Sequence, residues 1–180
     1  MNLKTIKIIS ILNIFILSFP AHFLYEFFPS PLISILFPVN ESIFEHMKII
    51  FTSTIISGII DYLILKLNNI KFNNFLFQLI FTSVISIFIF LIMYLPIHFL
   101  LGEYLIITIA LLFITYIISG IISYYILTFK PLPFLNIISI PLIIIIYLIF
   151  SYFTYNPPQN YFFYDTTTNS YGISKERATN

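Results

Sequence analysis

The stretch FLFQLIFTSVISIFIFLIMYLPIHFLL, residues 75–101, decides the fold class, because it contains no aspartate, glutamate, lysine or arginine. A helix needs about 20 apolar residues to cross the roughly 30 Å hydrocarbon core of a bilayer, and this run is longer than that. Only helices and closed barrels span lipid, so the β-branched residues of the run do not indicate a strand. We therefore expect a membrane-spanning helix here.

Comparable apolar runs lie on both sides of this stretch. Prolines and polar segments separate them and predict further spans at about 4–28, 42–67, 103–129 and 134–155. Residues 29–41 are too short to cross and are expected to form a surface or re-entrant segment. The prediction is an all-α, polytopic membrane helix bundle of five transmembrane helices over residues 1–155, followed by a polar extracytoplasmic tail, residues 156–180.

The composition supports a membrane location and excludes several classes of partner. The 180 residues are 59% hydrophobic and 8% charged, with a net charge of +1, so the lipid bilayer is the expected environment and nucleic acid is not an expected partner. The chain has no cysteine, which excludes disulfides and cysteine metal sites. Isoleucine, phenylalanine, asparagine and lysine are favoured throughout, which is typical of an AT-rich genome. We therefore expect a multi-pass protein of a bacterial plasma membrane.

The positions of the lysines predict the orientation. Cytoplasmic loops carry an excess of lysine and arginine. With the N-terminus inside, one end of the bundle collects Lys4, Lys7, Lys66, Lys71 and Lys130. The expected topology is therefore N-in/C-out. The same topology places His22, His46 and His98, together with Glu26, Glu41, Glu45 and Glu103, at or near the outer face.

The segment Pro38–Lys48 is the densest group of ionisable residues in this apolar chain. Charged groups inside a membrane are costly and usually face a cavity or each other, so a polar site is expected at the extracytoplasmic end. A structural interpretation covers part of the segment. Ser42 and Glu45 have the spacing of a capping box, in which each side chain bonds the backbone amide of the other residue. We expect a structural cap at the start of this helix, formed by Asn40, Ser42, Glu45 and Lys48.

A metal site is the alternative interpretation. His22 and Glu26 are four residues apart and project from one helical face, where Glu41 and His46 of the next helix would meet them. Two imidazoles with carboxylates suit a divalent metal such as zinc, manganese or iron. Glu45 would then be the catalytic base that takes a proton from metal-bound water. His98 is a peripheral candidate, and the same side chains could instead form an ion-paired lock between helices.

Two further features carry weaker expectations. Asp61 is close to Lys66, so an interfacial ion pair between them is expected, and a station on a proton path is the alternative. Aromatic residues are dense around the start of the tail, which is expected to lie against the outer surface and to cover the polar cluster.

Several segments resemble a family of small bacterial membrane proteins, common in Firmicutes, that is classified only as a domain of unknown function. The family pattern is approximately HFLYEW followed by SPVNESVWEHLKLLF. The matching residues here are His22-Phe23-Leu24-Tyr25-Glu26, Pro38-Val39-Asn40-Glu41-Ser42, Glu45-His46 and Lys48, and the ending resembles the family in Pro157-Pro158, Asp165 and Tyr171-Gly172-Ile173. Phenylalanines replace the family's tryptophans and one serine at Phe27 or Phe28, Phe44 and Phe37. The resemblance implies a fold and a membrane location but no activity.

Three classes of function stay open at this point. The first is a structural or accessory membrane protein in which the His/Glu cluster locks helices together. The second is a metal-dependent membrane enzyme of the hydrolase type. The third is a small proton- or cation-coupled transporter, although five spans without a clear repeat disfavour it.

Overall fold

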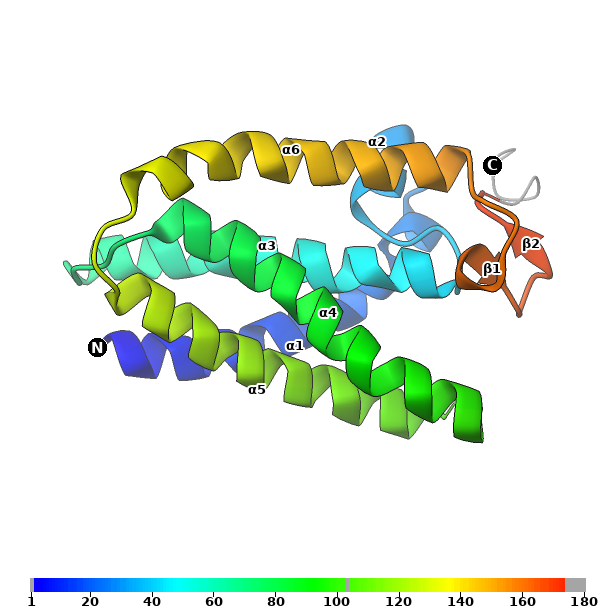
Figure 1. Ribbon diagram of the computed structural model, residues 1–180, viewed down its shortest axis with the longest axis horizontal. Coiled ribbons are helices and arrows are strands. Elements are labelled where there is room, and N and C mark those ends of the chain that lie inside the picture. Colours follow the sequence, from blue (N-terminus) through cyan, green and yellow to red (C-terminus); the bar gives the residue numbers. More distant parts are fainter. Residues whose placement is uncertain (1, 103, 174–180) are drawn as a thin grey trace.

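The computed structural model describes residues 2–102 and 104–173 and consists mainly of helices (Figure 1). Its α-helices are α1 (Leu3–Phe27), α2 (Pro31–Leu36), α3 (Ile43–Leu67), α4 (Phe75–Leu101), α5 (Leu105–Thr128) and α6 (Pro133–Tyr155). The tail adds a 3-10 helix, η1 (Tyr161–Phe163), and an antiparallel hairpin of β1 (Tyr164–Asp165) and β2 (Ser170–Tyr171).

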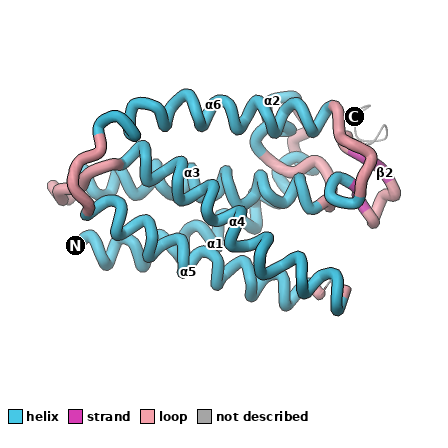
Figure 2. The backbone as a smooth tube through the Cα atoms, in the orientation of Figure 1, coloured by secondary structure: helices cyan, strands magenta, loops and turns pink. Residues whose placement is uncertain are grey.

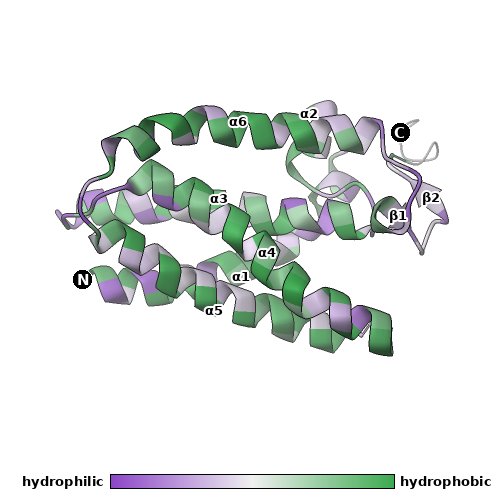
Figure 3. Cartoon of the chain, in the orientation of Figure 1, coloured by the Kyte–Doolittle hydropathy of each residue, from purple (hydrophilic) through white to green (hydrophobic). Residues whose placement is uncertain are grey.

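Five of these helices, α1, α3, α4, α5 and α6, are long and apolar enough to cross a membrane. The predicted all-α fold with five helices of spanning length is confirmed, and the chain is a multi-pass membrane protein. Helix α1 begins at one end of the bundle and the tail hairpin of β1 and β2 lies at the opposite end, as an odd number of crossings requires (Figure 1). Hydrophobic residues cover most of α5 and α6 (Figure 3). Which end faces the cytoplasm stays a prediction.

Local sequence signals explain where the helices begin and end. Ser30 caps α2, and Pro31 occupies its first turn, where no amide donor is needed. Ser42 caps α3 with its side-chain oxygen on the amide of Glu45. Gly102 ends α4 with a φ of 85°, a conformation that glycine adopts without strain. The predicted surface or re-entrant segment, residues 29–41, thus contains the short helix α2.

Helix α3 is the centre of the packing. It lies against α1 on one side and α4 on the other, while α5 packs on α1 and α4, and α6 packs on α4 and α2 (Figure 2). Its side chains Phe44, Ile50 and Phe51 are buried in the main hydrophobic core. The rings of Phe44 and Phe150 lie with centroids 5.8 Å apart, which joins α3 to α6.

The loop between α2 and α3 is folded into the end of the bundle rather than extended over it. Phe37, Val39 and Asn40 in this loop are all buried. Because the loop is buried and joins α2 directly to the start of α3, it can hold the side chain of Glu41 at a defined place beside α1 and α3.

Candidate metal centre

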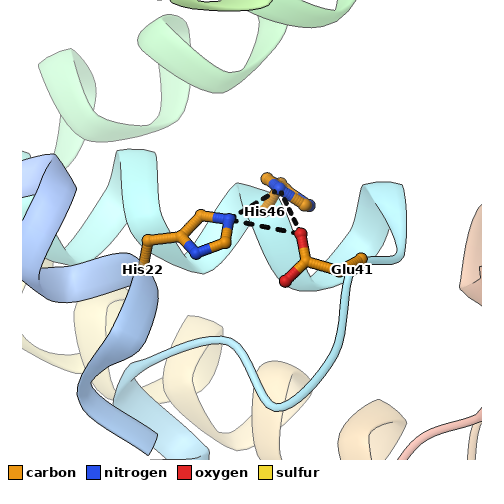
Figure 4. A group of neighbouring side chains, drawn as sticks. All are labelled: His22, Glu41 and His46. Atoms are coloured by element: carbon orange, nitrogen blue, oxygen red, sulfur yellow. Dashed lines mark hydrogen bonds and ion pairs between the residues drawn. The ribbon is translucent and has the colours of Figure 1, made fainter. Parts of the chain in front are cut away.

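The antiparallel packing of α1 against α3 brings two histidines together. His22 lies near the end of α1, and His46 lies in the first turn of α3, so both occur at the same end of the bundle. Glu41 comes from the buried loop, one residue before the cap of α3. Figure 4 shows the side chains of all three pointing toward one another.

The donor atoms of these residues form a nearly equilateral triangle. His22 Nε2 is 3.3 Å from His46 Nε2 and 3.3 Å from Glu41 Oε2. His46 Nε2 is 3.5 Å from Glu41 Oε2. Among the described residues, these are the three His, Cys, Asp or Glu side chains that could share one metal ion.

The size of the triangle suits tetrahedral coordination. Ligands at the usual zinc distances of about 2.0–2.2 Å stand about 3.3–3.6 Å apart at the corners of a tetrahedron. An octahedral ion with bonds of about 2.0–2.1 Å requires adjacent ligands about 2.8–3.0 Å apart. The side chains of His22, Glu41 and His46 are 26%, 39% and 28% exposed, so one side of the triangle is open. Three protein ligands with an open fourth position are typical of catalytic rather than structural zinc sites.

The hydrogen bond of His46 Nδ1 leaves Nε2 of the same ring available as a metal ligand. His46 Nδ1 lies 2.9 Å from the carbonyl oxygen of Ser42. A carbonyl can only accept, so Nδ1 donates in this hydrogen bond. In the neutral form of the ring, the lone pair then lies on Nε2. This backbone bond to the far nitrogen also orients the ring, as it does in many metal sites.

The charge state of Glu41 also suits a cation. The hydrogen bond with His22 holds the pKa of the Glu41 carboxyl below its ordinary value, outweighing the opposite effect of partial burial. The positive charge that His46 and His22 carry when protonated lowers the pKa of Glu41 further, whereas the negative charge of Asp165 raises it. Glu41 is therefore ionised at neutral pH and supplies one negative charge to the triangle.

Two other predicted candidates lie outside the triangle. Glu26 is exposed and does not belong to the group of donor atoms. It is one turn farther along α1 than His22, which places it about 6 Å beyond the level of His46. His98 is buried on α4, with Nδ1 3.1 Å from the Tyr94 hydroxyl and Nε2 in contact with the Tyr161 hydroxyl. Glu103, also expected near the outer face, lies outside the described residues.

The cap of α3 differs in part from the predicted capping box. Ser42 Oγ accepts from the Glu45 amide at 3.3 Å, as the motif requires. The second bond of the motif, from the Ser42 amide to the Glu45 side chain, is absent among the described contacts, because the Ser42 amide donates to Asn40 Oδ1 at 2.9 Å. The Glu45 carboxylate instead accepts from the Val39 amide at 3.0 Å. A folded loop before the helix provides these nearer partners, which the spacing of the motif does not reveal.

Glu45 belongs to a buried network rather than to the triangle. Its Oε2 lies 2.7 Å from Lys48 Nζ, and its Oε1 accepts from the Thr154 hydroxyl at 2.8 Å. Lys48 also donates to the carbonyl oxygen of Ser34 at 2.7 Å and to Thr154. The network ties α3 to α2 and α6, and it occupies both oxygens that the predicted catalytic base would need. Sequence reasoning missed Thr154, for which no motif gives a signal.

The tail covers the loop that carries Glu41. Asn40 Nδ2 donates to the carbonyl oxygen of Gly172 at 2.8 Å, so the same asparagine joins the tail to the start of α3. Asp165 is fully buried, and burial raises the pKa of its carboxyl. Hydrogen bonds from Thr167 and Thr168 outweigh this effect and hold the pKa of Asp165 below its usual value. The tail is thus a folded element against the buried loop.

The ion pair of Asp61 is not the predicted one. Its Oδ2 lies 2.6 Å from Nζ of Lys7 on α1, so the expected pairing with Lys66 is wrong. Lys66 is exposed and lies 5.6 Å from the ring centroid of Tyr62. Because Asp61 faces α1 inside the bundle, a lysine 54 positions away in the sequence reaches it.

The fold and the site together define a multi-pass helical membrane protein with a group of metal-ligating side chains at one end of its bundle. The chain belongs to a family of unknown function, DUF6512, which matches residues 1–173. No curated protein and no solved structure matches the chain.

Proposed function

We propose that the protein binds one divalent transition-metal ion, preferentially zinc, through His22, Glu41 and His46. The observation that carries this proposal is the triangle of donor atoms, whose edges of 3.3–3.5 Å fit a face of a zinc tetrahedron. The proton on His46 Nδ1 and the ionised Glu41 carboxylate support it, because both leave the ligand atoms ready for a cation.

The proposed setting is a bacterial plasma membrane with the N-terminus inside, so that the metal faces the extracytoplasmic side. The lysines support this orientation, since Lys4, Lys66, Lys71 and Lys130 lie at the opposite end of the bundle from the triangle. A metal there would take a ligand from the outer aqueous phase in its open fourth position.

Metal-dependent hydrolysis is a second candidate function, favoured by that open position. A metal ion lowers the pKa of bound water and polarises a substrate oxygen. Glu45 is not included in this candidate as the base, because the buried network holds it. A purely structural or accessory role, in which the triangle only locks α1 to the loop, is the alternative that the experiment must separate.

The test is an equilibrium zinc titration of the full-length protein in detergent, in competition with a chromophoric zinc chelator. His22→Ala and His46→Ala should each weaken zinc binding by more than about 100-fold, since losing even an outer-shell partner costs about 10–100-fold. His98→Ala is the matched control, because it removes the third histidine at a buried position outside the triangle. It should bind zinc as the unaltered protein does.

A structural lock gives a different result. The unaltered protein would then bind zinc no more tightly than the His22→Ala and His46→Ala variants, although those variants would be less stable than the unaltered protein. That pattern would overturn the proposal.

A further inference from the structure

The tail contacts the metal site through the loop that carries Glu41. Figure 1 shows the tail hairpin at the end of the bundle where α3 begins. The side chain of Asn40, which directly precedes Glu41, donates to the carbonyl oxygen of Gly172 at 2.8 Å. Two residues that are 132 positions apart are thus joined next to a proposed metal ligand.

Asn40 fixes the backbone on both sides of Glu41. Its Nδ2 is bonded to the tail, and its Oδ1 accepts from the amide of Ser42 at 2.9 Å. Asn40 and Ser42 are 5% and 2% exposed, whereas the side chain of Glu41 between them is 39% exposed. The carboxylate of Glu41 therefore reaches the triangle from a backbone segment whose two neighbours are buried and hydrogen-bonded.

Asp165 of the tail contacts Glu41 itself. The backbone amide of Glu41 donates to the Asp165 carboxylate. This carboxylate is fully buried, and it accepts from the amide and hydroxyl of Thr167 at 2.8 and 2.6 Å and from those of Thr168 at 3.3 and 2.7 Å. Because four donors of its own turn hold the carboxylate, it is a rigid acceptor for the Glu41 amide.

The tail has further contacts that keep it in place. The ring centroid of Phe163 lies 4.7 Å from that of Phe44 on α3 and 5.4 Å from that of Phe153 on α6. At Gly172 an added Cβ would lie 2.6 Å from the carbonyl oxygen of Thr154, so the tail lies directly against the end of α6. The tail is consequently packed on the bundle and can support the loop.

The triangle depends on the direction in which Glu41 points. His22 and His46 belong to helices, which fix their backbones, whereas Glu41 is the one proposed ligand that comes from a loop. Its place is therefore set by the contacts of that loop. Groups that orient a ligand without touching the metal typically change metal affinity by about 10–100-fold when they are removed.

We propose that Asn40 and Asp165 are positioning residues of the metal site, and that they couple the packing of the tail to metal binding. Both hold the backbone of Glu41, so that its carboxylate points at His22 and His46. This coupling rests on the proposed metal site, to which it adds the tail. Coupling between two such events is reciprocal: if the packed tail raises the affinity for zinc, bound zinc stabilises the packed tail by the same factor.

The experiment measures hydrogen exchange of the full-length protein in detergent by mass spectrometry, with saturating zinc and with a chelator. Zinc should slow the exchange of peptides within residues 164–173 by about 10-fold or more, which is the factor expected from the positioning contacts. The loop at residues 68–74 is the internal control, because it lies at the opposite end of the bundle from the tail hairpin. Its exchange should not change with zinc.

Two variants connect this effect to the positioning residues. Asn40→Ala should weaken zinc binding by about 10–100-fold and abolish the effect of zinc on exchange in the tail. Asn160→Ala is the matched control, since the side-chain oxygen of Asn160 accepts within the tail, from the amide of Phe162 at 3.1 Å. It should bind zinc as the unaltered protein does and keep the effect of zinc on exchange.

If Asn40→Ala fails to give a folded protein, Asp165→Asn decides the question. Asparagine has one acceptor oxygen for the donors that share two oxygens of Asp165, so the Glu41 amide has to compete with Thr167 and Thr168. Asp165→Asn should therefore weaken zinc binding by about 10-fold or more relative to Asn160→Ala.

A tail with a merely structural role gives a different result. Asn40→Ala would then be less stable than the unaltered protein in thermal unfolding without metal, but it would bind zinc as tightly as Asn160→Ala does. Zinc binding by the unaltered protein without any change of exchange in the tail would also overturn the coupling, and it would leave the proposed metal site intact. If the unaltered protein binds no zinc, both proposals are wrong, so the two failures are distinguishable.

Discussion

Replacing Glu45 with glutamine should destabilise the protein far more than the same change at Glu26. Glu45 and Lys48 are 2% and 0% exposed, and their charged groups are 2.7 Å apart. The glutamate accepts from three donors, namely Lys48 Nζ, the Val39 amide and the Thr154 hydroxyl. A glutamine side chain has the same shape but has no charge and one acceptor oxygen fewer.

The magnitude follows from what the change leaves behind. Lys48 keeps its contacts with Ser34 and Thr154, but it loses the one carboxylate that pairs with it among the described residues. Removing one member of a buried ion pair costs about 3–5 kcal/mol, because the remaining charge stays buried without compensation. Glu26 is exposed and outside any such network, so Glu26→Gln should change the free energy of unfolding by less than about 0.5 kcal/mol.

The assay is reversible unfolding of the purified protein in mixed micelles by titration with SDS, followed by far-UV circular dichroism. Lys48→Met and the double variant with Glu45→Gln complete a double-mutant cycle. The double variant should lose clearly less than the sum of the single losses, because it leaves no unpaired charge. Equal losses for Glu45→Gln and Glu26→Gln would refute the assignment of Glu45 to a buried tie between α2, α3 and α6.

Two further predictions concern the tail and the loop. In thermal unfolding, Gly172→Ala should destabilise the protein by about 1–3 kcal/mol more than Gly102→Ala. Both glycines have a positive φ, but only at Gly172 would the new Cβ meet a backbone oxygen, that of Thr154 at 2.6 Å. Equal losses of stability for the two variants would contradict the close packing of the tail. The pKa of Glu41 is lower in the fold than its ordinary value of 4.5, so the ionised carboxylate stabilises the fold above that value and this contribution disappears as the pH falls through the lowered pKa. The free energy of unfolding of Glu41→Gln should therefore fall less steeply with pH in this acid range than that of the unaltered protein. An equal pH dependence of the two proteins would show that Glu41 is not held by His22.

The fold class could be predicted because apolar length alone limits the possible structures. Runs such as residues 75–101 can only be spanning helices, and prolines or a glycine mark their ends. The partnership of His22 with His46 could be predicted as well, because the topology sends the two histidines to one end of adjacent helices. Such arguments locate residues to within about one helical turn, or about 5 Å.

The contacts that fix the site could not be predicted at that precision. Glu26 and Glu41 were equal candidates from spacing, and only the folded loop shows that Glu41 completes the triangle. Thr154 reaches Glu45 because α6 returns to the start of α3, across 109 positions. Lys7, and not Lys66, is the partner of Asp61 because α1 packs against α3. Contacts between residues far apart in the sequence determine these partners, whereas proximity in the sequence predicts different ones.

The measurement that tests the central claim most directly is metal analysis of the protein purified in detergent without added metal or chelator. Binding through His22, Glu41 and His46 predicts about one zinc per chain, lost in His46→Ala and kept in His98→Ala. A protein that carries no stoichiometric transition metal and takes up none when zinc is supplied would contradict it.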